Sequence, residues 1–173
     1  AMDQLGQLLD SPVRFLLGRT VAITRVRREL VTLALVKLAM GDHEQAAAAL
    51  DTKWSPQLTA EERSWVWGVI GKQAALKLSP AAWSHFAKVE RDTDLPGDLL
   101  AWKARTALRT GRWKELSTTI QAMGDELRNE PTWVYWRARA LQQTGREADR
   151  AEAAGLFESI AGVRGFYEQL ALE

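Results

Sequence analysis

Four basic residues recur at matching positions of a segment that occurs twice, 34 residues apart, and could bind an anion. Lys103 and Arg137 share one of these positions, and Arg105 and Arg139 share another. Equivalent positions of stacked repeats line up on one surface. Arginine can hold a carboxylate through two parallel hydrogen bonds, so the pattern predicts a weak glycan- or peptide-binding strip. The alternative is a solvated helix face on which nearby carboxylates balance these charges.

Other residue types give no catalytic or metal-binding pattern. His43 and His85 have no partner histidines or carboxylates at a spacing suited to a metal. The sequence contains no cysteine, which excludes a disulfide framework and a thiolate metal site. It has no phosphate-binding loop, and we expect no cofactor. The eight tryptophans are typical of side chains that fill the space between helices; the alternative is that an exposed one contacts a sugar.

The bulk composition is that of an ordinary globular protein. The chain has 173 residues, of which 46% are hydrophobic and 26% charged, and its formal net charge is +1. This balance provides no electrostatic drive towards nucleic acid or an anionic membrane. No apolar run reaches the roughly 18 residues of a membrane span, and no secretory signal opens the chain. We therefore expect no nucleic-acid partner and no membrane span.

Helix start and stop signals predict an all-α chain. Proline suits the first helical turn, where its missing N–H would be unpaired anyway, and prolines stand at 12, 56, 80, 96 and 131. Thr59 and Glu62 have the spacing of a capping box. The expected helices span about 22–40, 43–53, 60–78, 80–90, 97–110, 112–123, 131–143 and 147–161, with a last one from about 165. The segment 60–78 is apolar on more than one side, so we expect it to be wedged between neighbours.

The turns between these helices repeat. An alanine stands seven residues before a glycine at Ala34 and Gly41, at Ala104 and Gly111, and at Ala138 and Gly145. The last two glycines are 34 residues apart, the tetratricopeptide period, and one more turn is expected near Leu78, with Gly71 as the small residue. A turn glycine adopts a left-handed conformation at little cost. The sequence predicts an α-α superhelix, a tetratricopeptide-like solenoid of helical hairpins, as a single domain over 1–173.

The last third of the chain carries a more specific pattern. The run EPTWVYWRARALQQTGRE at 130–147 is followed by GFYEQLA at 165–171. This combination resembles the superhelical region of the soluble lytic murein transglycosylases. In that family a W-x-Y-W-x-A helix, a G-R turn and an F-Y-x-x-x-A segment precede the linker to the catalytic domain. The runs RVRRELVTLA at 25–34 and ERSWVWG at 62–68 are similar to the same region, so the resemblance covers roughly 20–173.

The resemblance implies a periplasmic lyase of the bacterial cell wall. Such enzymes cleave the β-1,4 bond between N-acetylmuramic acid and N-acetylglucosamine without water. They use one glutamate of a C-terminal lysozyme-like domain, whereas ordinary glycosidases need two carboxylates. The Gly-x-x-Gln and Ala-Tyr-Asn patterns of that domain do not occur in this sequence. A Glu-Ser pair, Glu158 and Ser159, lies inside an expected repeat helix, and we interpret it as a chance match rather than a catalytic residue.

The sequence thus favours a non-catalytic scaffold of a lytic transglycosylase. Its expected partners are peptidoglycan, through the full-length protein, and the family's own catalytic domain downstream of residue 173. The alternative is a free-standing tetratricopeptide-like adaptor that binds other proteins. The final segment carries Phe166, Tyr167 and Leu170. We expect it to pack back onto the last hairpin, to fray or to pair with a neighbouring molecule.

Overall fold

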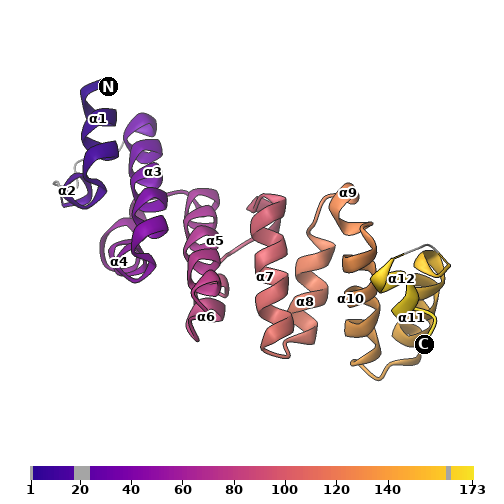
Figure 1. Cartoon of the computed structure of the whole chain (residues 1–173). Coiled ribbons are helices and arrows are strands. Elements are labelled where there is room, and N and C mark those ends of the chain that lie inside the picture. Colours follow the sequence, from indigo (N-terminus) through magenta and orange to yellow (C-terminus); the bar gives the residue numbers. More distant parts are fainter. Residues whose placement is uncertain (1, 18–23, 163–164) are drawn as a thin grey trace. The chain divides into compact units, whose positions relative to one another are not determined.

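The regular structure of the chain is helical throughout the described residues (Figure 1). The computed structural model describes residues 2–17, 24–162 and 165–173, and no strand occurs among them. The helices are α1 (Met2–Asp10), α2 (Pro12–Leu16), α3 (Arg25–Gly41), α4 (His43–Ala49), α5 (Ala60–Leu76), α6 (Ala82–Phe86), α7 (Gly97–Arg109), α8 (Trp113–Gln121), α9 (Asp125–Arg128), α10 (Pro131–Gln142), α11 (Glu147–Ile160) and α12 (Phe166–Leu170). The all-α prediction is confirmed.

Two compact units make up the chain, one ending at Leu95 and the other beginning at Pro96. Whether residues 1–173 behave as a single domain stays a prediction. In the first unit, α3 and α4 form one antiparallel hairpin, and α5 and α6 form the next. Helix α5 packs against α3, α4 and α6, and it buries Val66, Trp67 and Ile70. The expectation that this helix is wedged between neighbours is therefore confirmed.

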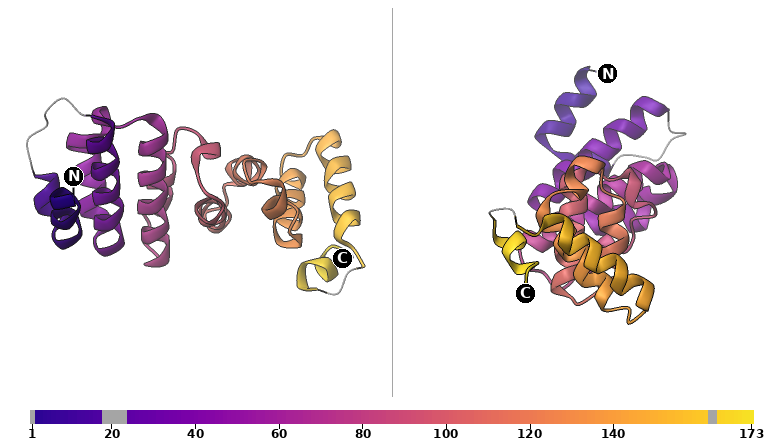
Figure 2. Two further views of the ribbon diagram at one scale, coloured as in Figure 1. Left: turned by 90° about the horizontal axis from the view of Figure 1, so that it is seen from above. Right: turned by 90° about the vertical axis from the view of Figure 1, so that its right-hand side faces the viewer.

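The second unit repeats the hairpin arrangement. Helices α7 and α8 pair, α10 and α11 pair, and α8 packs against α10. Helix α12 returns to pack on α10 and α11 (Figure 1 and Figure 2). The Tyr167 ring of α12 lies 5.4 Å from the ring of Tyr135, beside Val134 and Ile160. The final segment thus packs back onto the last hairpin, one of the three outcomes expected from its apolar residues.

Two of the predicted helices end earlier than expected. Helix α4 stops at Ala49 and continues as a π-helical turn over Leu50–Trp54. Helix α6 stops at Phe86, and after Ala87 the amides of Lys88 and Val89 bond three residues back rather than four. The amide of Glu90 then donates to the Ser64 hydroxyl of α5 at 3.2 Å. This bond draws the chain onto α5, so the segment after Phe86 does not continue as a helix.

The turn that closes the α5–α6 hairpin has leucine where the later hairpin has glycine. Gly111 has φ +68 and Gly145 has φ +74, whereas Leu78 has φ +57. Leu78 and Gly111 occupy equivalent positions in two turns of the same type. In each turn the amide of the following residue donates to the carbonyl five residues back, Ser79 to Ala74 and Arg112 to Ala107. Gly41 differs from the expectation. It is the last residue of α3, and Asp42 continues directly into α4 by capping its N-terminus, so no left-handed residue is needed.

The left-handed backbone at Leu78 predicts a stabilising substitution. This conformation costs a non-glycine residue about 1–2 kcal/mol, and the Leu78 side chain is 66% exposed, so its removal loses little burial. After the extra backbone entropy of glycine is subtracted, we expect Leu78→Gly to raise the free energy of unfolding by about 0.5–1 kcal/mol. Urea unfolding followed by circular dichroism measures the change. The reciprocal variant Gly111→Ala should destabilise; stabilisation by both variants, or by neither, would contradict the assignment.

Close approach of two helices depends on Gly71. A Cβ atom placed on Gly71 of α5 would lie 2.8 Å from Cγ of the Phe86 ring, and Phe86 is fully buried on α6. Real Cβ atoms do not come this close to ring carbons. The glycine was expected to serve as the small residue of this hairpin, and the structure confirms that role.

One carboxylate begins α5 and also joins it to α3. Glu62 accepts the Thr59 amide at 2.8 Å, while the Thr59 hydroxyl accepts the Glu62 amide, so the predicted capping box is present. The same Glu62 carboxylate accepts Nε of Arg28 at 3.2 Å. Arg28 and Glu62 are 34 residues apart, which is the spacing of the later repeat. Both side chains are largely buried.

Candidate binding groove in the second helical unit

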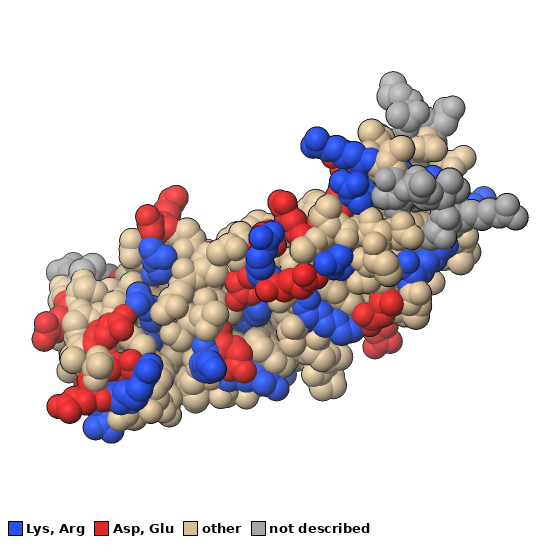
Figure 3. All heavy atoms as spheres, turned by 180° about the vertical axis from the view of Figure 1, so that it is seen from behind, with Lys and Arg blue, Asp and Glu red and all other residues tan. Residues whose placement is uncertain are grey.

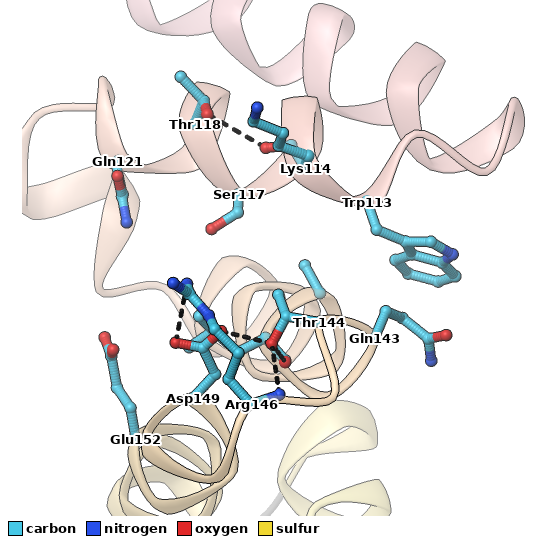
Figure 4. Close-up of a pocket in the computed structure, with 12 residues that line it drawn as sticks. Trp113, Lys114, Ser117, Thr118, Gln121, Gln143, Thr144, Arg146, Asp149 and Glu152 are labelled. Atoms are coloured by element: carbon cyan, nitrogen blue, oxygen red, sulfur yellow. Dashed lines mark hydrogen bonds and ion pairs between the residues drawn. The ribbon is translucent and has the colours of Figure 1, made fainter.

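A groove in the second unit lies between α8 and the turn that joins α10 to α11 (Figure 4). It encloses about 690 Å³, which is within the usual size range of small-molecule sites. Nine of its twelve lining residues have polar or charged side chains, and the full set is Trp113, Lys114, Ser117, Thr118, Gln121, Ala140, Leu141, Gln143, Thr144, Arg146, Asp149 and Glu152.

One wall of the groove is a single face of α8. Trp113, Ser117 and Gln121 stand four residues apart, a spacing that places side chains along one side of a helix. The neighbouring stripe of Leu116 and Ile120 is fully buried and anchors the helix to the rest of the unit. Figure 4 shows Trp113 and Gln121 at opposite ends of the groove. The groove-facing side of α8 is therefore polar apart from one aromatic ring.

The opposite wall is held in place by a buried carboxylate. Asp149, only 8% exposed, accepts the Thr144 hydroxyl and the Arg146 guanidinium, with Nε at 2.8 Å and Nη2 at 3.2 Å. The hydrogen bond from Thr144, followed by those from Arg146, holds the pKa of the Asp149 carboxyl below its ordinary value. Asp149 is also in the first turn of α11, where a negative charge is favoured. This wall is consequently ordered without a ligand.

Both carboxylates around the groove are paired. Arg146 bonds Asp149, and Glu152 bonds Arg137 of α10. Figure 3 likewise shows acidic and basic side chains interspersed on the face in view. Because both carboxylates of the lining already have an arginine partner, the groove offers little to a polycation. The exposed ammonium of Lys114 is the one charge of the lining that has no ion-pair partner among the described residues.

The structure separates the four basic residues that were predicted to form one strip. Lys103 is only 7% exposed, because it shares its side of α7 with Leu99 and Thr106. Arg137 is half-buried and paired with Glu152. Arg105 and Arg139 are exposed. Of the two helices in the preceding hairpin, α8 rather than α7 packs against α10.

Arg105 is oriented by two tryptophans. Its guanidinium lies 5.2 Å from the Trp102 ring centroid on α7 and 5.5 Å from that of Trp133 on α10. Arginine commonly makes such cation–π contacts. The contact with Trp133 joins Arg105 to the following hairpin. The guanidinium remains exposed and can donate hydrogen bonds to a carboxylate.

The two histidines form an aromatic cluster in the first unit. Their rings are 6.2 Å apart, edge to face, and the His85 ring stacks on Trp67 at 5.8 Å. His43 is 6% exposed, and neither of its ring nitrogens has a hydrogen-bond partner among the described residues. No group of three metal-binding side chains occurs in the described part of the chain. The cluster is consistent with the structural role that the sequence indicated.

Burial of His85 predicts acid sensitivity. Desolvation, then the charges of His43 and Lys88, lower the pKa of His85 below 6.5, against opposing effects of Asp51 and Glu44. The unfolded chain therefore binds more protons than the folded chain just below pH 6.5, so stability falls as the pH drops through this range. We expect His85→Phe, which keeps an aromatic ring on Trp67, to weaken this dependence. Thermal unfolding at pH 7.5 and 5.5 tests it; equal shifts in both proteins would contradict it.

The Glu158–Ser159 pair lies on the exposed surface of α11. The Ser159 hydroxyl donates to the carbonyl of Leu156 at 2.6 Å, a bond within its own helix.

No helix of the described residues is long and apolar enough to cross a membrane.

The groove was not predicted from the sequence. Trp113, like the other tryptophans, was expected to fill the space between helices, but it is half-exposed beside the buried stripe of Leu116 and Ile120. The signal that could have revealed the groove is the polar series of Ser117 and Gln121, one helical turn apart behind Trp113. Trp113 lies at the boundary between the buried face and the groove-facing side of α8. Periodicity alone does not determine to which of the two faces its ring belongs.

Successive antiparallel hairpins place this chain in the class of all-α helical-repeat proteins. No protein-family model matches it. It is 26% identical over 162 residues to the soluble lytic murein transglycosylase of Escherichia coli strain K12, and 25% identical to that of Salmonella typhimurium, over 90% of this chain and 24% of each relative. These matches show that the chain is homologous to a region of the soluble lytic murein transglycosylases.

Solved structures agree with this assignment. An inactive mutant of the lytic transglycosylase Slt from Pseudomonas aeruginosa matches with a TM-score of 0.70 and 26% identity, over 98% of this chain and 27% of that one. The 70 kDa soluble lytic transglycosylase of Escherichia coli matches in fold, with a TM-score of 0.66 and 23% identity. The chain spans about a quarter of the length of the curated relatives it matches.

Proposed function

We propose that this chain is a non-catalytic helical scaffold of a soluble lytic murein transglycosylase. It positions peptidoglycan strands for non-hydrolytic cleavage of the bond between N-acetylmuramic acid and N-acetylglucosamine by a C-terminal domain. The observation that carries the proposal is homology over 90% of the chain to only about a quarter of such enzymes. The names of the relatives refer to murein, and the proposed site of action is the periplasm.

Two exposed arginines support a role in strand positioning. Arg105 and Arg139 are exposed and can donate paired hydrogen bonds to the carboxylates of peptide stems. We propose these two arginines as the anion-binding groups. Lys103 and Arg137 of the originally expected strip contribute through packing and the ion pair with Glu152.

The proposal predicts that the isolated chain does not cleave peptidoglycan. Glu158 belongs to the Glu-Ser pair that could be mistaken for the family's catalytic motif. The hydroxyl of the following residue, Ser159, donates to a carbonyl within the same helix. We expect purified sacculi incubated with this chain to release no anhydro-muropeptides above a blank, as measured by mass spectrometry. A parallel sample of the same sacculi, digested with an active lytic transglycosylase, verifies that the substrate can be cleaved. Products that depend on this chain would overturn the non-catalytic assignment.

A further inference from the structure

We propose that the groove between α8 and the α10–α11 turn binds a neutral oligosaccharide about two sugar rings long. The inference rests on the proposed function for the source of the sugar, the glycan backbone of peptidoglycan. The chemical class follows from the groove itself, which combines one aromatic ring, several uncharged hydrogen-bonding groups, carboxylates that are already paired and the single exposed ammonium of Lys114.

The dimensions of the groove fit a disaccharide. Trp113 and Gln121 mark its two ends (Figure 4). They are eight residues apart in α8, and a helix rises 1.5 Å per residue, so the wall between them is about 12 Å long. Two linked pyranose rings occupy a space of this length. An open groove of about 690 Å³ also allows a longer glycan to continue past either end.

Uncharged donors and acceptors along the groove are not used within the protein. The side chains of Ser117, Gln121 and Gln143 make no hydrogen bond to another side chain or backbone group among the described residues. A hydroxyl and two amides can each donate and accept. Sugar hydroxyls and N-acetyl groups require partners of both kinds. These side chains come from both sides of the groove, so a bound sugar would be contacted from two directions.

The aromatic ring lies where it can cover a sugar face. Trp113 is half-exposed and makes no ring contact with another aromatic residue of the described chain. In Figure 4 its indole projects from α8 at the end of the groove near Gln143. Tryptophan combines an apolar face with a polar N–H, and the C–H face of a pyranose is its apolar counterpart.

The opposite wall adds rigidity and disfavours a basic ligand. Asp149 is fixed by Thr144 and Arg146, so this side of the groove does not need to order on binding. Because Asp149 and Glu152 are already neutralised by arginines, the groove offers no uncompensated carboxylate to a basic peptide. A neutral saccharide requires neither ion pair to break.

Titration of the full chain with the N-acetylglucosamine tetramer tests the proposal, with binding followed by heteronuclear NMR. We expect saturable shifts at α8 and the α10–α11 turn. The variants Trp113→Ala and Ser117→Glu should each weaken binding by at least about tenfold, through loss of the ring and through steric and charge conflict respectively. Ser117 is on the surface of α8, so Ser117→Glu keeps the test valid if the tryptophan variant misfolds. Trp65→Ala, at a half-buried ring in the first unit, is the matched control.

Failure of the tetramer to bind, or equal binding by wild type and both groove variants, would overturn the saccharide site. Binding of a free stem peptide in the groove without binding of the tetramer would also overturn it. Co-sedimentation with sacculi separates this inference from the proposed function. If the wild-type chain binds sacculi but not the tetramer, only the groove assignment is overturned. If the wild-type chain does not bind sacculi, the proposed function is overturned.

Discussion

Replacement of Gly71 by alanine is expected to destabilise the first unit by about 1 kcal/mol. The new methyl group would lie 2.8 Å from the Phe86 ring, and Phe86 is fully buried, so either the ring or helix α6 must move. Insertion of one carbon into a well-packed core costs about 1–3 kcal/mol. This penalty exceeds the roughly 1 kcal/mol by which alanine is the better helix former. Urea unfolding followed by circular dichroism measures the change.

Gly41→Ala is the matched control for this prediction. Gly41 is also a helical glycine of the first unit, but a Cβ at this position meets no atom within 4 Å. We expect Gly41→Ala to be neutral or slightly stabilising, because only the helix propensity changes. If Gly71→Ala were as well tolerated as Gly41→Ala, the close approach of α5 and α6 would not depend on the glycine.

The double substitution Arg105→Glu, Arg139→Glu is expected to reduce binding to sacculi about tenfold while the fold is retained. Each exposed arginine can make a charge-assisted contact with a stem carboxylate, and replacement by glutamate turns attraction into repulsion. A loss of about 1.4 kcal/mol corresponds to a factor of ten in affinity. Added salt should weaken binding of the wild-type chain in the same direction, because it screens exposed charges. Co-sedimentation with purified sacculi measures both effects.

A second pair of exposed arginines in the same unit controls for net charge. Arg109→Glu combined with Arg150→Glu changes the charge by the same amount, and both residues are exposed. We expect this control to retain most of the binding. Equal loss in the two double variants would assign the effect to overall charge, and salt-insensitive binding by all three proteins would exclude the arginine contacts.

The helices were largely predictable because their signals are local. The capping box at Thr59 and the proline at 131 mark helix starts through nearby backbone groups, and both begin helices in the structure. Helices α1, α2 and α9 were not predicted. Pro12 had marked a start, but α2 is only five residues long and α9 only four, so neither provides a full period of the apolar pattern.

The binding residues were less predictable because they depend on rotation and neighbours. Lys103 matches Arg137 in the repeat, yet its place on α7 one turn after Leu99 directs it into the protein. Helical periodicity alone would have predicted that Lys103 is buried. The comparison of equivalent repeat positions led instead to the prediction that it is exposed like a binding residue. The partner of Arg105 could not be predicted in the same way, because Trp133 approaches it from another hairpin. Contacts across hairpins depend on how helices pack, which a single sequence does not specify.

The dual role of Glu62 has a kinetic consequence for the first unit. Starting a helix is unfavourable on its own, since several residues become ordered for one hydrogen bond. The carboxylate that compensates for this at α5 is also the one that holds Arg28 of α3. Nucleation of α5 and its docking on α3 therefore favour each other. The same carboxylate thus links the start of the second hairpin of this unit to the first helix of the preceding one.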